Sequence, residues 1–141
     1  MTSHTYSHDY FPAMPTLEIY LSLPSESPLV GPLTAVVDTG ADGTLVPARI
    51  LARFRTAETD QAWIVSQWGE YRLAKAYMLD IHLGVLRLPA HRVVSDDRGK
   101  EIILGRDVLN KLRLLLDGPE QTTEILEAKP TRKPGRAGSS S

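Results

Sequence analysis

The chain has 141 residues, of which 42% are hydrophobic and 23% are charged, and its formal net charge is -1. This size and composition are typical of one globular domain with a sizeable core, and the near-neutral charge argues against a nucleic-acid or membrane-surface partner. The absence of cysteine excludes a disulfide framework and thiolate catalysis, and no stretch approaches the ~20 apolar residues of a membrane span, so we expect a cytoplasmic protein.

Residues 1–15 are polar, contain two prolines and predict a flexible N-terminal arm. The arm holds His4, His8 and Asp9, a spacing that could chelate a metal ion. No further ligand in the neighbourhood fixes a geometry for an ion, so we expect scattered histidines rather than a metal site.

The first strand is predicted over residues 16–23, where apolar side chains alternate with polar ones at Leu17, Ile19, Leu21 and Leu23. Prolines and serines at residues 24–28 predict a turn. Residues 29–38 then form a second predicted strand, whose apolar end runs directly into Asp38.

The end of this second strand is the most informative point of the chain. Ala35-Val36-Val37 is followed by Asp38-Thr39-Gly40, and a second short apolar run begins after Thr44. This pattern predicts a buried strand that delivers a carboxylate to a tight turn. A carboxylate there is costly unless it is hydrogen-bonded or exposed in a cleft, and Gly40 allows close approach of another backbone.

The middle of the chain predicts a short helix over 47–54 and two strands, 61–65 and 70–83, joined by a hairpin tip at Ser66–Gly69. On the second of these strands we expect one shared face, formed by Tyr71, Leu73, Tyr77, Leu79, Ile81 and Leu83. A further strand is predicted over 86–94, where Pro89 indicates an edge or a bulge.

The last part of the chain predicts a short strand over 101–104, two helical turns over 106–112, and a hairpin formed by 113–117 and 121–127. Residues 128–141 are rich in Pro, Gly, Ser and basic residues and predict a disordered tail. Many short strands with frequent turns predict a mainly β, barrel-like domain over 16–127. His82 and His91 fall on neighbouring strands without a carboxylate partner, so we expect neither a metal site nor a cofactor there.

Two segments together carry a family resemblance. Asp38-Thr39-Gly40-Ala41-Asp42-Gly43-Thr44 resembles the active-site loop of retroviral-type aspartic proteases (retropepsins), and Ile102-Ile103-Leu104-Gly105-Arg106-Asp107-Val108-Leu109 resembles their closing motif. The resemblance implies a retropepsin-like barrel with one short C-terminal helix followed by a terminal β-hairpin. Because the hairpin at 113–127 is longer than the ending of the viral enzymes, the chain looks more like the cellular and bacterial members.

The resemblance implies a homodimeric aspartic endopeptidase whose partners are a second copy of the chain and a peptide or protein substrate. Peptide hydrolysis by carboxylates needs two of them, which share one proton and activate a water. The chain supplies only one Asp-Thr-Gly and is too short for a second lobe, so Asp38 of each subunit would meet on a two-fold axis. The alternatives are a dimeric peptide-binding or assembly module of the same fold and an unrelated β-domain with a coincidental turn.

The resemblance also implies roles for single residues. Asp38, Thr39 and Gly40 would be catalytic, with the Thr39 hydroxyl joining the two loops across the axis. Substrate would contact Ala41, Asp42, Trp68 and Gly69, the last two at the tip of a hairpin that covers it as a flap. Structural support would come from Gly105 and Arg106, the latter by an ion pair to Asp42. Three alternatives remain: Asp42 serves only the turn, Arg106 contacts the substrate directly, and Trp68 is a surface aromatic.

Overall fold

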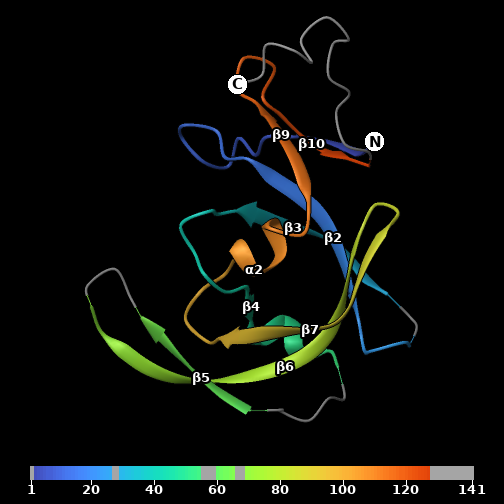
Figure 1. The fold of residues 1–141 in the computed structure, drawn as a ribbon. Helices are drawn as coiled ribbons and strands as arrows, with labels where there is room; N and C mark the ends of the chain where they lie inside the picture. The colour runs from blue at the N-terminus through green and yellow to red at the C-terminus, as the bar shows by residue number, and fades with distance from the viewer. Residues whose placement is uncertain (1, 27–28, 55–59, 66–68, 128–141) are drawn as a thin grey trace, which may run out of the picture.

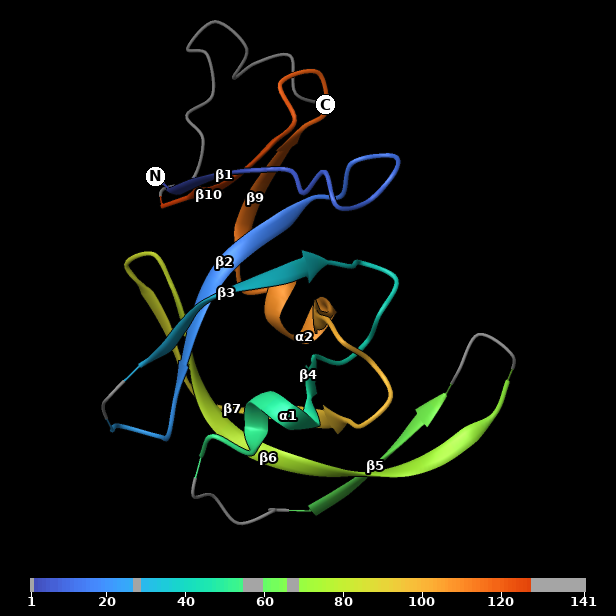
Figure 2. The ribbon, with the colours of Figure 1, turned by 180° about the vertical axis from the view of Figure 1, so that it is seen from behind.

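The computed structural model describes residues 2–26, 29–54, 60–65 and 69–127, and Figures 1 and 2 show its ribbon from opposite sides. The elements in chain order are β1 Thr2–Thr5, β2 Thr16–Ser22, β3 Val30–Val37, β4 Leu45–Pro47, α1 Ala48–Leu51, β5 Asp60–Val65, β6 Tyr71–Leu83, β7 Leu86–Asp96, β8 Ile102–Leu104, α2 Arg106–Leu109, β9 Arg113–Asp117 and β10 Thr122–Leu126. No helix within the described residues is long and apolar enough to cross a membrane.

The main sheet has seven strands in the order β2-β3-β8-β4-β7-β6-β5. An additional antiparallel pairing of β2 with β6 closes the strands from β2 to β6 into a barrel, and β5 extends outward from β6. The mainly β barrel predicted from the sequence is therefore confirmed. Helix α2 has four residues, which is one turn rather than the two turns that the sequence suggests.

The core fills the inside of the barrel. Leu17, Ile19 and Leu21 of β2 are fully buried, as their alternation predicts. Across the sheet, β3 pairs in parallel with β8, which places Ala35 opposite Ile102 and continues the same apolar layer. The strand that leads to Asp38 is thus anchored from both sides before it leaves the sheet.

The predicted face of β6 is wrong in the first half of the strand. Tyr71 and Leu73 are 69% and 49% exposed, whereas Ala74 and Ala76 are buried. From Leu79 onward the odd-numbered side chains face the core, as expected. The strand changes its buried side between Ala76 and Leu79, before the pairing of β6 with β7 shifts register between Leu79 and Ile81.

The predicted bulge near Pro89 is confirmed by this register shift. The bulge is held by Asp80, whose buried carboxylate accepts the N–H of Ala90 at 2.7 Å and the N–H of Ser25 at 2.9 Å. Burial acts to raise the pKa of Asp80, but these N–H donors and the nearby Arg87 guanidinium hold the pKa below its ordinary value. The bulge is therefore stabilised by an ionised carboxylate.

The prediction of a flexible N-terminal arm is wrong for its first residues. β1 pairs antiparallel with β10, and together with β9 they form a separate sheet in the order β1-β10-β9. Polar sequence misleads here because strand addition uses backbone N–H and C=O groups, and the threonines suit a pleated strand. The predicted hairpin near the end of the chain forms the other two strands of this sheet.

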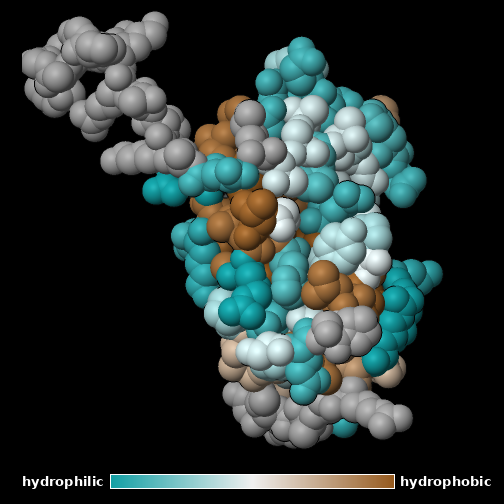
Figure 3. Space-filling model, turned by 90° about the vertical axis from the view of Figure 1, so that its right-hand side faces the viewer, coloured by the Kyte–Doolittle hydropathy of each residue, from teal (hydrophilic) through white to brown (hydrophobic). Residues whose placement is uncertain are grey.

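The surface is mostly hydrophilic, with separate apolar patches on the face that Figure 3 shows. Exposed large apolar side chains among the described residues include Phe11, Leu29, Val85, Leu115 and Leu116. The predicted disordered tail, 128–141, lies outside the described residues.

Candidate active site

The candidate catalytic carboxylate belongs to Asp38, the first residue after β3. The three residues before Asp38 are buried, while Asp38 itself is partly exposed. The N–H of Asp38 donates to the carbonyl of Leu104 at 3.1 Å, and the Asp38 Oδ1 accepts the N–H of Gly40 at 2.9 Å. The carboxylate therefore has a hydrogen-bond donor and contact with solvent, which together remove the cost of placing it at the end of an apolar strand.

The two segments that carried the family resemblance lie side by side. The N–H of Arg106 donates to the carbonyl of Ala41, and its guanidinium Nη1 donates to the carbonyl of Thr39, both at 2.8 Å. The expected ion pair of Arg106 with Asp42 is wrong: it is not among the contacts of the described residues. The turn instead presents a main-chain carbonyl to the guanidinium, so Arg106 supports the loop without a carboxylate partner.

Gly105 allows the close approach of these two segments. Its φ of -87° is ordinary, so its conformation does not demand glycine. A Cβ built on Gly105 would lie 2.4 Å from the carbonyl oxygen of Gly43 and 2.6 Å from its carbonyl carbon. Only glycine fits without a backbone shift, which agrees with a structural role for this residue.

A hydrogen-bond network beneath the loop was missed by the sequence reading. The Thr44 hydroxyl donates to Asp107 Oδ1 at 2.7 Å and accepts the N–H of Gly105 at 3.2 Å. Asp107 Oδ2 lies 3.0 Å from His91 Nε2, so the expectation that His91 lacks a carboxylate partner is wrong. Burial acts to raise the pKa of Asp107, but the hydrogen bonds from His91 and Thr44 hold the pKa below its ordinary value.

The hairpin of β5 and β6 is the candidate flap. The two strands pair from Asp60 opposite Ala76 to Val65 opposite Tyr71. In both ribbon views the hairpin reaches beyond the barrel on the side where the chain leaves β3 (Figures 1 and 2). Gly69 is exposed with a φ of +78°, as a turn glycine requires, and Trp68 lies outside the described residues.

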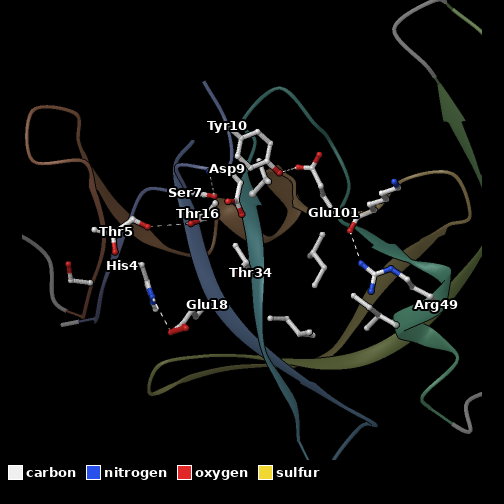
Figure 4. Close-up of a pocket in the computed structure, with 16 residues that line it drawn as sticks. His4, Thr5, Ser7, Asp9, Tyr10, Thr16, Glu18, Thr34, Arg49 and Glu101 are labelled. Atoms are coloured by element: carbon white, nitrogen blue, oxygen red, sulfur yellow. Dashed lines mark hydrogen bonds and ion pairs between the residues drawn. The ribbon is translucent and has the colours of Figure 1, made fainter. Parts of the chain in front are cut away.

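A polar cavity of about 650 Å³ lies on the outer face of β2 and β3, between the N-terminal segment and α1 (Figure 4). The Tyr10 hydroxyl bonds to the Glu101 carboxylate at its rim; burial, followed by this carboxylate, raises the pKa of Tyr10 to about 12. Val36 lines the cavity but Asp38 does not. The cavity is therefore a neighbour of the candidate active site rather than part of it.

Comparison with solved structures gives similar folds. The chain is similar to a retropepsin-like aspartic protease from Rickettsia conorii, with a TM-score of 0.60, 11% identity and 88% of each chain covered. It is also similar to the EIAV protease in complex with the inhibitor HBY-793, with a TM-score of 0.54 and 21% identity over 77% of this chain and 93% of that one. At these identities the likeness concerns the fold, and it confirms the expected retropepsin-like barrel.

Comparison of the sequence gives the family. No curated protein matches the chain. The family model described as retroviral aspartyl protease matches residues 13–117, a range that includes both the loop after β3 and the segment from β8 through α2 to β9. The resemblance seen in the sequence is thereby confirmed, and the chain belongs to the retroviral aspartyl protease family.

Proposed function

We propose that the chain is an aspartic endopeptidase that acts as a homodimer, with Asp38 of each subunit in one active site. The observation that carries this proposal is the construction of the Asp38 loop. Three main-chain carbonyls, those of Leu104, Thr39 and Ala41, are bonded across the contact between the loop and the segment that follows it. The loop is thus rigidly held while its carboxylate remains open to solvent, which is what preorganised catalysis needs.

A second copy is needed because one carboxylate cannot perform this chemistry. Asp42, four residues further along, is exposed, and the contacts of the described residues link no other carboxylate to Asp38. A two-fold axis beside the exposed Thr39 and Gly40 would bring the same loop of another subunit against Asp38. Two carboxylates at short range cannot both ionise, so the pair would hold one proton.

The shared proton lets the two carboxylates act as base and acid in the same hydrolysis. The ionised carboxylate takes a proton from water, whose oxygen attacks the carbonyl carbon of the scissile bond, while the protonated carboxyl donates to the carbonyl oxygen. Collapse of the tetrahedral intermediate breaks the C–N bond as the nitrogen receives a proton, and the carboxylates return to their starting state. Water is the nucleophile, so no covalent enzyme intermediate forms.

The neighbouring residues take supporting roles in this proposal. The Thr39 hydroxyl bonds to the loop of the second subunit, and Gly40 and Ala41 leave room for the substrate backbone. Asp42 accepts hydrogen bonds from the substrate main chain. Gly69 lets the hairpin of β5 and β6 turn above the bound peptide, together with Trp68.

The test is digestion of a peptide library by the purified full chain between about pH 4 and 7. We expect cleavage by the wild type and none by Asp38→Asn, which keeps the shape of the side chain but cannot be a base. Asp9→Asn, the same change at an exposed position of the N-terminal segment, is the matched control and should cleave like the wild type.

Two outcomes would overturn the proposal. Cleavage that survives Asp38→Asn would remove Asp38 from catalysis. A wild type that dimerises and binds peptides from the library without cutting any would favour the binding module instead.

A further inference from the structure

The inference concerns the polar cavity on the outer face of β2 and β3 (Figure 4). Thr34 and Val36 of β3 line this cavity. The N–H of Asp38 bonds to the carbonyl of Leu104 and so continues the pairing of β3 with β8 by one residue. Because side chains alternate along a strand, Asp38 projects from the same face as Thr34 and Val36. Val36 therefore brings the cavity to within about 7 Å of Asp38 along the strand.

One end of the cavity carries two cationic side chains. Arg49 in α1 and Lys100, two residues before β8, both line it. Arg49 Nη2 donates to the main-chain carbonyl of Lys100 at 3.0 Å, so the guanidinium is held beside the residue that carries the ammonium group (Figure 4). Within the part of the chain that the structure describes, neither side chain has a carboxylate at ion-pair distance. We call Arg49 and Lys100 the cation pair.

The carboxylates closest to the cation pair along the chain already have partners. Glu101 accepts a hydrogen bond from the Tyr10 hydroxyl. Asp96 and Asp97 both bind the guanidinium of Arg72. The cation pair is therefore left to attract an anion from outside the chain.

The opposite end of the cavity carries a negative charge. The Glu18 side chain is 56% exposed and lies 3.7 Å from the ring of His4. Figure 4 shows Glu18 and Arg49 on opposite sides of Thr34. Positive and negative charges are thus separated along the cavity, so an anion is drawn toward α1 and repelled from the other end.

We propose that Arg49 and Lys100 bind an acidic side chain of the peptide substrate, an Asp or a Glu about three to five residues from the scissile bond. An extended peptide advances about 3.3 Å per residue, as a strand does. Ala35, three residues before Asp38, is paired with Ile102, and Lys100 lies two residues beyond that pair. About three to five residues of substrate therefore span the distance from Asp38 to the cation pair. This inference rests on the proposed function for the peptide and adds the class of sequence that is preferred.

The chemistry of the two side chains suits a carboxylate. The planar guanidinium of Arg49 uses one N–H for the Lys100 carbonyl, and its other N–H groups match the two oxygens of a carboxylate. Arg49 is half-buried and Lys100 is exposed, so water screens part of the attraction. Exchanging Glu for Lys in the substrate turns attraction to both cations into repulsion, and we expect this exchange to lower kcat/KM about tenfold.

The first test starts from a peptide that the wild type cleaves. Each position three to five residues from the cleaved bond is replaced in turn by Glu, Gln and Lys, and kcat/KM is measured for each peptide. At one of these positions the wild type should prefer Glu over Gln and Gln over Lys. Arg49→Glu and Lys100→Glu should each reverse this order. Arg53→Glu, the same change at an exposed position that does not line the cavity, is the matched control and should keep the order of the wild type.

The second test measures binding without cleavage. The full chain with Asp38→Asn is titrated into fluorescein-labelled octapeptides of alternating Ala and Glu, Ala and Gln, or Ala and Lys, each with blocked ends, and fluorescence anisotropy is followed. The Glu peptide should bind about tenfold more tightly than the Lys peptide, and adding Lys100→Glu should remove this preference. Inorganic phosphate at the concentration of the peptide should not displace the Glu peptide. Displacement by phosphate would identify a site for small anions and overturn the inference.

The outcomes separate this inference from the proposed function. If the wild type cleaves the Glu, Gln and Lys peptides equally well, or if Arg49→Glu and Lys100→Glu both leave the order unchanged, recognition by the cation pair is overturned and cleavage by Asp38 is untouched. Lys100→Glu keeps the main-chain carbonyl that Arg49 binds, so it remains informative if Arg49→Glu fails to fold. If the Glu peptide binds as expected but the wild type cuts no peptide, the binding site stands and the peptidase proposal fails.

Discussion

Replacing Asp107 by alanine tests whether the network beneath the Asp38 loop stabilises the fold. The change removes the acceptor of two groups at once: the Thr44 hydroxyl at 2.7 Å and the His91 ring nitrogen at 3.0 Å. Both partners are nearly inaccessible, at 1% and 8% exposure. They cannot simply turn to water when the carboxylate is removed.

The expected loss follows from these two orphaned donors. A buried donor without an acceptor costs about 1–3 kcal/mol, so two of them give roughly 2–6 kcal/mol. The Asp107 side chain is itself 31% exposed, so water will enter the space and satisfy part of the loss. We therefore expect a decrease of about 2–3 kcal/mol in the free energy of unfolding, a large share of the ~5–15 kcal/mol typical of a domain.

The measurement is urea denaturation of wild type and Asp107→Ala at several pH values. The folded-state pKa of Asp107 lies below its ordinary value, so its contribution is complete above the unfolded value of about 4 and is lost as the pH falls through the folded one. The difference between the two proteins should thus be greatest near neutral pH and shrink in acid. Asp107→Asn, which keeps one oxygen acceptor but no charge, should fall between them.

Two results would refute this reasoning. A loss smaller than about 0.5 kcal/mol near neutral pH would mean that the network adds nothing measurable. A difference that grows as the solution is acidified would mean that the ionised carboxylate is not the stabilising form.

Three further predictions concern single side chains elsewhere in the chain. Gly105→Ala puts a methyl group 2.4 Å from a backbone oxygen, and we expect it to cost about 1–3 kcal/mol or more in thermal unfolding; an unchanged melting temperature would contradict the close packing of the two segments. The pKa of Asp80 is held below its ordinary value, so its ionised carboxylate stabilises the fold above about pH 4, and this stabilisation is lost as the pH falls below that value. Near neutral pH, Asp80→Asn should unfold at a lower temperature than the wild type when unfolding is followed by circular dichroism. In acid, the melting temperatures of the two proteins should converge. The pKa of Tyr10 is raised to about 12, so its bond to Glu101 stabilises the fold below about pH 10 and is lost as the pH rises toward 12. In an ultraviolet titration of the tyrosines, Tyr10→Phe should remove one phenol that ionises at high pH. An unchanged titration curve would mean that this phenol belongs to another tyrosine.

The sequence predicted best where a pattern is local. The alternation in residues 16–23 is a property of one strand against one core, and the observed burial of Leu17, Ile19 and Leu21 follows it. The order of strand, Asp38, tight turn and later glycine was equally predictable, because each of these features depends on the residues of its own segment. In the structure, hydrogen bonds from Arg106 to the loop after Asp38 join these two segments.

The sequence predicted poorly where structure depends on a distant partner. β6 changes its buried side between Ala76 and Leu79, where its pairing with β5 ends, and the carboxylate of Asp80 binds backbone groups that are 10 and 55 positions away. β1 is a strand only because β10 offers it an edge. His91 meets Asp107 through packing of β7 against α2, and no spacing in the sequence signals it. In each case the outcome depends on which residues are neighbours in space, and the preferences of single residues for a strand or a turn do not reveal this.

The pairing of β1 with β10 of the same chain has one more consequence. These two strands, one from each end of the described chain, are tied to each other inside a single molecule, so their pairing does not depend on an encounter with a second copy. Under the proposed mechanism, only the completion of the catalytic centre depends on an encounter with a second copy of the chain. Turnover per molecule would then rise with the total amount of the polypeptide and fade on dilution, which makes the level of synthesis itself a regulator of proteolysis.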